Sequence, residues 1–366
     1  MTQHIYNELM NLVSLDDTFY FKDHVLGNET YRVFSYRLAS WSQFMAPSAL
    51  SCRGIMFRVT DGKQELASFP MDKFFNVGEG GIDTEGHTVA CYMEKLDGSL
   101  ISTFIHEGQL RLKSKTSLNS EQAIAAMRWI DRKENSEFKA YATNLALSGK
   151  TVNMEYTSPM NRIVCPYQEE KLTILSVRDH RTGVNQIHFD NPFHVKVQTT
   201  NLDYYSFEKS VEDMRDIEGY VIQVRKPSSE LYLVKKKTEW YCALHRTKDS
   251  ISSDRRLFEC VINESSDDLR SIFAGDNFTL NRVKDMEEKV IPKFNQIVRD
   301  TETFYAENKH LVKKDYAIKG QQEVKEIFPL VMELYVGREP DFKAFAVKHQ
   351  KDIFGVSDKV YENGDS

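Results

Sequence analysis

Short runs of alternating apolar and polar residues make up the chain as far as about residue 241. Such runs, enriched in β-branched and aromatic residues, predict β-strands. We expect strands at residues 54–59, 89–93, 100–105, 110–115, 151–156, 172–177, 220–224 and 231–237. The polar segment 106–109 contains a glycine and predicts a hairpin between two of them.

Helical signals interrupt this strand pattern at two places. Ser120 is a candidate N-cap for a helix that carries Ile124, Met127 and Ile130 on one side. Gly149 is a candidate C-terminal stop for a second helix. Strands with interspersed helices predict an α+β domain.

The pattern changes after about residue 250, where apolar residues recur at helical spacing. Residues 250–357 therefore predict a small all-helical domain, in which Pro292 would kink or split one helix. We expect two domains, 1–247 and 248–366, and a frayed tail at 361–366. A length of 366 residues is sufficient for two domains of this size.

The composition excludes several classes of protein. Hydrophobic residues make up 41% of the chain and charged residues 28%, as in soluble globular proteins, and no apolar run is long enough to span a bilayer. The N-terminus lacks the basic-then-apolar order of a secretory signal. The five cysteines are scattered and form no C-x-x-C pair, which predicts buried thiols in a reducing cytoplasm.

The net charge of −6 argues against a protein that coats nucleic acid indiscriminately. The net charge is compatible with a local basic groove, because basic residues cluster at 113–115, 235–237 and 245–248. Lys113 and Lys115 lie two residues apart in an expected strand and would share one face. We expect Lys113 to be exposed to solvent on that face.

The sequence Glu94-Lys95-Leu96-Asp97-Gly98-Ser99 carries the most specific chemistry in the chain. An expected strand leads into Lys95 and a turn with Gly98 follows it, so the lysine lies at the edge of a sheet. A lysine amine is nucleophilic only when deprotonated, and neighbouring cations and desolvation lower its usual pKa of about 10.4. The alternative is a solvated lysine beside a β-turn, because so short a string also occurs by chance.

Further charged residues in strand surroundings are candidate companions of this lysine. Glu155 and Glu218 could bind a ribose hydroxyl and a magnesium ion, which takes oxygen ligands. Arg53 precedes a glycine-started strand, where a guanidinium can bind a phosphate or ribose. Lys73 lies near Phe75, an arrangement that can stack a purine and hold its phosphate. The alternatives are surface ion pairs for the charged groups and core packing for the aromatic rings.

Alternation along residues 231–237 places Lys235 and Lys237 at the end of an otherwise apolar face. Two lysines in that position are favourable where an anion binds. Lys236 points to the opposite face, where a basic side chain in water is the simpler interpretation.

Together these segments resemble the covalent nucleotidyltransferase superfamily of ATP-dependent DNA and RNA ligases and mRNA capping enzymes. The resemblance is strongest to the bacteriophage RNA ligase 1 family, the phage tRNA-repairing RNA ligases, and covers essentially the whole chain. The segments that carry it are 31–36, 52–57, 73–76, 95–99, 120–123, 161–164, 217–221, 240–241 and 244–245.

The resemblance implies a role for each matching residue. Lys95 matches the lysine that becomes adenylylated. Glu155 and Glu218 match the carboxylates of the third and fourth nucleotidyltransferase motifs, and Lys235 and Lys237 match the lysines of the fifth. Positions that contact ATP are matched by Tyr36, Arg53 and Lys73. Other positions important for ligation are matched by Phe75, Gly98, Lys115 and Tyr241.

A metal site is also implied by the resemblance, with Mg²⁺ as the ion and Glu155, Glu218 and Asp267 as its ligands. Asp267 matches a metal-binding aspartate of the helical domain, although Ser265-Ser266-Asp267-Asp268 is equally a helix start. Lys236 departs from the family pattern, in which an apolar residue is usual at this position.

The implied fold is α+β: an ATP-grasp-like ligase domain of antiparallel sheets with helices, followed by a small all-α domain that selects RNA. The implied reaction joins 5′-phosphate and 3′-hydroxyl RNA ends at the expense of ATP, through lysyl-AMP and an adenylylated RNA 5′ end. The implied partner is RNA, in particular a nicked tRNA anticodon loop. We expect a monomer without membrane association, in the cytoplasm of an infected host cell.

Other functions on the same scaffold are a DNA ligase, a capping enzyme and a non-catalytic RNA-binding module. DNA ligases and capping enzymes normally carry a β-barrel OB domain after the fifth motif, where this chain has a helical pattern. A binding module has no use for a nucleophile such as Lys95.

Overall fold

The computed structural model describes residues 2–357 except 61, 80–81, 160–164, 166, 213, 239–240, 242–252 and 274–276. It divides into two compact units, Met1–Leu244 and His245–Ser366. The matching segments 161–164 and 244–245, the basic cluster 245–248 and the tail 361–366 lie outside the described residues.

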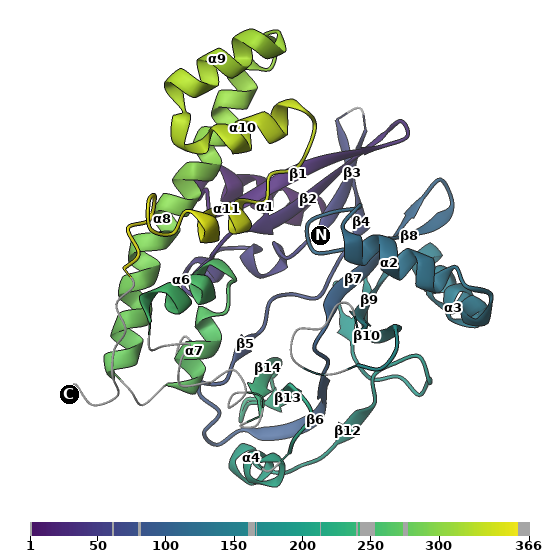
Figure 1. The fold of residues 1–366 in the computed structure, drawn as a ribbon. Helices are drawn as coiled ribbons and strands as arrows, with labels where there is room; N and C mark the ends of the chain where they lie inside the picture. Colours follow the sequence, from purple (N-terminus) through teal and green to yellow (C-terminus); the bar gives the residue numbers. More distant parts are fainter. Residues whose placement is uncertain are drawn as a thin grey trace. The chain divides into compact units, whose positions relative to one another are not determined.

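The described residues of the first unit form three β-sheets (Figure 1). The first sheet has the order β1 (Phe19–Leu26), β2 (Glu29–Tyr36), β3 (Met56–Thr60), β4 (Lys63–Ser68). The second has the order β11 (Asn185–Gln186), β10 (Lys171–Asp179), β9 (Lys150–Thr157), β7 (Ser99–His106), β8 (Gln109–Lys113). The third has the order β12 (Val197–Thr199), β6 (Thr88–Lys95), β13 (Gly219–Arg225), β14 (Leu231–Lys237), β5 (Phe75–Asn76). Among the described strands, only β5 and β14 pair in parallel.

Helices cover these sheets. The helices of this unit are α1 (Thr2–Leu15), α2 (Glu121–Ile130), α3 (Ser136–Leu147) and α4 (Tyr204–Val211). α2 and α3 pack on the second sheet through one apolar cluster, α1 packs against the first sheet, and α4 against the third. The expected N-cap is confirmed, because Oγ of Ser120 accepts a hydrogen bond from the backbone N–H of Ala123 at 3.2 Å. The expected stop is confirmed at Gly149, whose φ is +78°.

The second and third sheets face each other across a small apolar cluster. Met93 and Val221 come from the third sheet, and Leu175 from the second. The turn between Lys95 and Ser99 carries the chain from the last residue of β6 in one sheet to the first residue of β7 in the other. Lys95 therefore ends its strand where the two sheets meet.

The prediction that Lys113 is exposed to solvent is wrong. β8 ends at this residue, so Lys115 lies beyond the strand and the two side chains do not alternate on one face. Lys113 is fully buried, and its Nζ donates a hydrogen bond to the carbonyl of Ser114 at 3.0 Å. The amine has space because it packs against Gly54, which has no side chain. Burial lowers the pKa of Lys113 to about 7.

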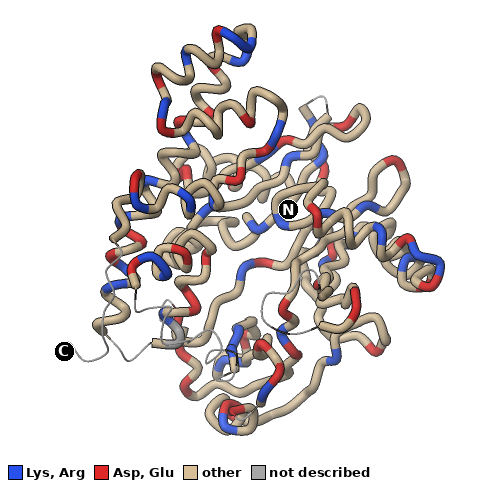
Figure 2. Tube along the Cα trace, viewed as in Figure 1, with Lys and Arg blue, Asp and Glu red and all other residues tan. Residues whose placement is uncertain are grey.

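The elements described in the second unit are all helices, joined by turns and loops. Its helices are α6 (Asp254–Ile262), α7 (Ser266–Ile272), α8 (Asn277–Asn308), α9 (Lys313–Glu323), α10 (Phe328–Tyr335) and α11 (Phe342–Lys348). α8 runs unbroken through Pro292, so the proline does not split it. Asp267 lies in the first turn of α7. Acidic and basic residues are interspersed along the described trace (Figure 2). No described helix is both long and apolar enough to cross a membrane.

Candidate active site

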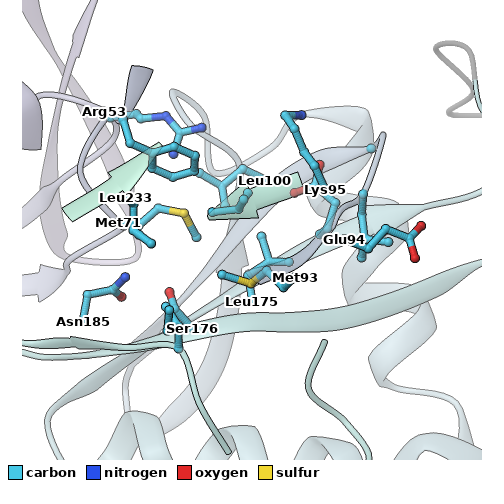
Figure 3. Close-up of a pocket in the computed structure, with 16 residues that line it drawn as sticks. Arg53, Met71, Met93, Glu94, Lys95, Leu100, Leu175, Ser176, Asn185 and Leu233 are labelled. Atoms are coloured by element: carbon cyan, nitrogen blue, oxygen red, sulfur yellow. The ribbon is translucent and has the colours of Figure 1, made fainter. Parts of the chain in front are cut away.

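A cavity of about 230 Å³ lies between the second and third sheets, at the place where β6 ends. Its apolar wall is formed by Met71, Phe74, Met93, Leu100, Leu175, Ile187, Val221 and Leu233. Its polar lining is formed by Arg53, Glu94, Lys95, Glu155, Ser176 and Asn185. Arg53 and Lys95 lie toward one end of the cavity, and Ser176 and Asn185 toward the other (Figure 3). The cavity thus has two polar ends joined by an apolar middle.

Glu218 joins two of the expected lysines. Nζ of Lys95 lies 2.5 Å from Oε2 of Glu218, and Nζ of Lys237 lies 3.1 Å from Oε1 of the same carboxylate. The Glu218 side chain is only 4% exposed, whereas that of Lys95 is 25% exposed and lines the cavity. The strand register produces this cluster, because Gly219, next to Glu218, pairs with Lys95 on one side and Lys237 on the other.

Glu155 and Arg53 complete the charged end of the cavity. Burial raises the pKa of Glu155 to about 7; the positive charge of Lys95 opposes this shift, and the negative charge of Glu218 adds to it. Nη1 of Arg53 is buried and has no hydrogen-bond partner among the described residues. An unpaired guanidinium N–H in a cavity is costly unless an anion binds there.

The turn after Lys95 is fixed by Asp97, which is buried. Its Oδ2 accepts a hydrogen bond from the backbone N–H of Cys165 at 2.9 Å, and its Oδ1 accepts one from the hydroxyl of Tyr241 at 3.2 Å. The ring of Tyr241 lies 4.7 Å from Nζ of Lys237. Tyr241 is therefore a support that links the Lys95 turn to the end of β14.

Two glycines allow the strands of the site to approach closely. A Cβ at Gly98 would lie 2.3 Å from the carbonyl oxygen of Tyr156, the neighbour of Glu155. A Cβ at Gly219 would lie 2.1 Å from the carbonyl oxygen of Lys236. Neither distance is possible for a real side chain, so both positions require glycine.

A second cluster contains four other expected residues, none of which lines the cavity. Nζ of Lys115 lies 3.7 Å from the ring centroid of Tyr36, and Nζ of Lys73 lies 5.2 Å from that of Phe75. The rings of Tyr36 and Phe75 both contact Phe44 edge-on. Both rings are buried in the core, which is the alternative interpretation given above for the aromatic residues. A lysine amine lies over the face of each ring.

The remaining expected residues are distributed as follows. Alternation in β14 keeps Lys235 on the face of Lys237. Lys236 points away and forms an ion pair with Glu208 at 2.5 Å. Asp267 belongs to the helical unit. Among the described residues, no group of three or more His, Cys, Asp or Glu side chains is placed to hold a metal ion.

The site contains residues that the sequence did not indicate. Ser176 reaches the cavity because a β-bulge at Leu175 shifts the pairing of β10 with β9. Asn185 comes from the two-residue strand β11, too short to produce an alternation. Arg178 offered a weak signal, a charged residue within an apolar strand. It donates to both carboxylate oxygens of Asp72, at 2.8 and 2.9 Å.

This arrangement has the parts that a nucleotidyl transfer requires. An accessible amine, that of Lys95, and the guanidinium of Arg53 line one end of a cavity with apolar walls. Next to the amine lie a carboxylate that can take its proton, Glu218, and a further cation that can hold phosphate oxygens, Lys237. The two carboxylates Glu155 and Glu218 also fit a Mg²⁺ ion, which is often held by one or two carboxylates together with substrate phosphates.

Comparison with known proteins gives a consistent result. The RNA ligase family model matches residues 51–241, and the model of the T4 RNA ligase 1 C-terminal domain matches residues 248–361. The chain is 28% identical over 268 residues to the "Putative RNA ligase" of Thermovibrio ammonificans, covering 66% of this chain and 68% of that protein. It is 27% identical over 273 residues to RNA ligase 1 of bacteriophage TS2126, covering 70% of this chain and 66% of that protein. The chain thus spans about two thirds of these relatives.

Among solved structures, an archaeal ATP-dependent RNA ligase aligns with a TM-score of 0.46 and 11% identity, covering 82% of this chain and 80% of the other. A likeness this distant has no bearing on function.

Proposed function

The chain belongs to the T4 RNA ligase 1 family, and from this membership we propose that it is an ATP-dependent RNA ligase acting through a covalent lysyl-AMP intermediate. The main support in the structure is Lys95. Its amine lies at the charged end of the cavity, 2.5 Å from a nearly buried carboxylate. Arg53, at the same end, has an N–H without a partner among the described residues.

The first step transfers AMP to the protein. Glu218 accepts a proton from Lys95, and the freed lone pair attacks the α-phosphorus of ATP. The N–P bond forms as the bond from the α-phosphorus to the bridging oxygen breaks, and pyrophosphate leaves with that electron pair. Lys237, Lys235 and Arg53 neutralise the phosphate oxygens, which is the main contribution a protein makes to phosphoryl-type transfer.

The second and third steps transfer AMP to RNA and expel it. An oxygen of an RNA 5′-phosphate attacks the phosphorus of lysyl-AMP, and Lys95 leaves with the N–P electron pair and regains a proton. The 3′-hydroxyl of another RNA end then attacks the activated 5′-phosphate, loses its proton, and AMP departs. A phosphodiester bond joins the two ends.

Magnesium fits this site as a second source of positive charge. Glu155 and Glu218 would hold the ion, and Asp267 would provide a ligand within the helical unit. When bound, Mg²⁺ supplies charge neutralisation at the phosphates. Lys235, Lys237 and Arg53 serve the same purpose as groups of the chain itself.

We assign lysine adenylylation to residues 1–247 and RNA selection to 248–366, with a nicked tRNA anticodon loop as the substrate. The elements described from residue 253 onward are all helices, which disfavours a DNA ligase or capping enzyme with an OB barrel at this point.

The proposal is tested by incubating the protein with α-labelled ATP and Mg²⁺ and separating it by denaturing electrophoresis. An acid-labile label on the protein is expected, followed by its transfer to 5′-phosphorylated RNA. A nicked anticodon stem-loop, a single-stranded RNA and a DNA of equal length should be sealed in decreasing order. Absence of any covalent label would leave the RNA-binding module as the better explanation.

A further inference from the structure

The end of the cavity opposite the charged cluster carries an amide oxygen that has no hydrogen-bond partner among the described residues. Asn185 lines this end together with Ser176. Its Oδ1 is buried and has no hydrogen-bond partner among the described residues. A buried polar atom that stays unpaired destabilises the fold, so such an atom in a cavity points to a ligand that pairs with it.

The walls beside Asn185 fit the flat faces of a nucleobase. Met71, Met93, Val221 and Leu233 line the cavity with apolar surface, and Arg53 and Lys95 lie toward the end away from Asn185. A nucleotide has the same order of parts, with an apolar-faced base at one end and phosphates at the other. With the phosphates at Lys95, the edge of the base would face Asn185.

The position of Asn185 is fixed by a buried guanidinium. Arg178, its register partner in β10, donates to both oxygens of Asp72 and, at 2.7 Å, to the carbonyl of Pro70. Its Nε donates to the carbonyl of Gly183 in the hairpin before Asn185, at 3.0 Å. One side chain thus ties the hairpin of Asn185 to the segment that carries Met71 of the cavity wall.

We infer that Asn185 is the residue that recognises the base of the nucleotide, by pairing its amide with the 6-amino group of adenine. This inference rests on the proposed function. An asparagine amide combines an acceptor with a donor, and adenine presents a complementary amino donor beside the ring acceptor N7. Guanine presents two acceptors along the same edge and cannot form both bonds.

The test compares ATP with the triphosphate of purine riboside, which has a hydrogen in place of the 6-amino group. The measured quantity is the rate of covalent nucleotide attachment at limiting nucleotide, followed by the intact mass of the protein. The unsubstituted protein should prefer ATP by roughly tenfold to a hundredfold. Asn185→Ala should lower the rate with ATP by a similar factor and react equally with both nucleotides.

Gln186→Ala is the matched control, because Gln186 carries the same amide, neighbours Asn185 in β11 and is exposed. It should keep the preference for ATP. Should Asn185→Ala fail to fold, as its melting profile would show, Asn185→Leu keeps the number and branching of the side-chain heavy atoms and permits the same comparison. A preference for ATP that persists unchanged in the folded Asn185 variant overturns the inference. Failure of the unsubstituted protein to attach either nucleotide overturns the proposed function instead.

Discussion

Oε2 of Glu218 lies 2.5 Å from Nζ of Lys95, and its other oxygen lies 3.1 Å from Nζ of Lys237. One buried carboxylate therefore holds both the proposed nucleophile and a lysine proposed to bind the triphosphate. Glu218→Gln keeps the shape and removes the charge and the proton acceptor. We expect protein labelling to slow at least a hundredfold, the lower end of what proton transfer contributes.

A suitable control for this variant is Glu208→Gln, since Glu208 pairs with Lys236 on the outer face of β14. Labelling by this control should be close to that of the unsubstituted protein. If both variants lost labelling equally, the rate would depend on the overall charge of the protein and not on the carboxylate beside Lys95.

Lys95 itself is the next test. Lys95→Ala should abolish the label because no amine remains to attack the α-phosphorus. Lys95→Arg should abolish it too, since a guanidinium stays protonated and is not nucleophilic. Electrophoresis after incubation with α-labelled ATP measures both variants, and label retained in either one would exclude Lys95 as the site of attachment.

The two faces of β14 give a third prediction. Lys235→Ala and Lys237→Ala should each reduce self-adenylylation strongly, because these side chains share the face that points to Glu218. Lys236→Ala should reduce it little, since Lys236 pairs with Glu208 on the opposite face. Rates of label incorporation distinguish the three, and a uniform loss would contradict the face assignment.

Lys113 gives a prediction about stability and pH. Its pKa is about 7 in the folded protein, against the usual 10.5 of a lysine in water, so the folded state binds fewer protons between these limits. The cost of burying the amine is fully present below pH 7 and disappears as the pH rises toward 10.5. Lys113→Met should therefore raise the free energy of unfolding by roughly 2–4 kcal/mol at pH 7.

Urea denaturation at pH 7 and at pH 10 measures this effect, and the difference between Lys113→Met and the unsubstituted protein should shrink at the higher pH. A constant difference across this range would show that the ionisation of Lys113 is not responsible.

The division into two units gives a fifth prediction. A fragment that ends after Thr247 should still attach AMP, because the residues proposed for adenylylation precede that point and the first unit buries its own clusters. It should lose activity on a nicked stem-loop more than on single-stranded RNA. Arg255 and Arg256 of α6 are candidate phosphate contacts, as are Arg246 and Lys248, which lie outside the described residues. Binding should weaken as salt rises.

A melting profile of the fragment provides the control. A folded fragment that binds no nucleotide would contradict the assignment of adenylylation to residues 1–247. An unfolded fragment would show that the helical unit is needed for stability.

Local patterns were sufficient to predict part of the fold. The hairpin at 106–109 is confirmed by the pairing of His106 with Gln109, and all eight expected strands are present, with ends that differ by a few residues. These elements have strong alternation or clear turn residues. Six described strands were not predicted. β5, β11 and β12 have two or three residues, which cannot establish a period, whereas β1, β2 and β4 are six to eight residues long and were missed.

The site divides in the same way. The cluster of Lys95, Glu155 and Glu218 was expected from the family resemblance, and the structure brings these residues together. Asn185 and the buried state of Lys113 were not predicted. Both depend on contacts between distant segments. The end of the cavity near Asn185 is shaped by the bulge at Leu175 and held by the guanidinium of Arg178. Lys113 can be buried because Gly54 has no side chain to occupy the same space.

Gly98 and Gly219 have a consequence for how substitutions combine. A side chain at either position would push against a neighbouring backbone and displace a whole strand, together with every charged group on it. Epistasis should follow: after Gly219→Ala, a further Lys237→Ala would remove little, because the first change has already moved that lysine. In a mutational scan, substitutions at these two glycines should therefore reduce activity about as much as substitutions of the proposed nucleophile. The loss would come from displaced backbone, because glycine has no side chain that could take part in the reaction.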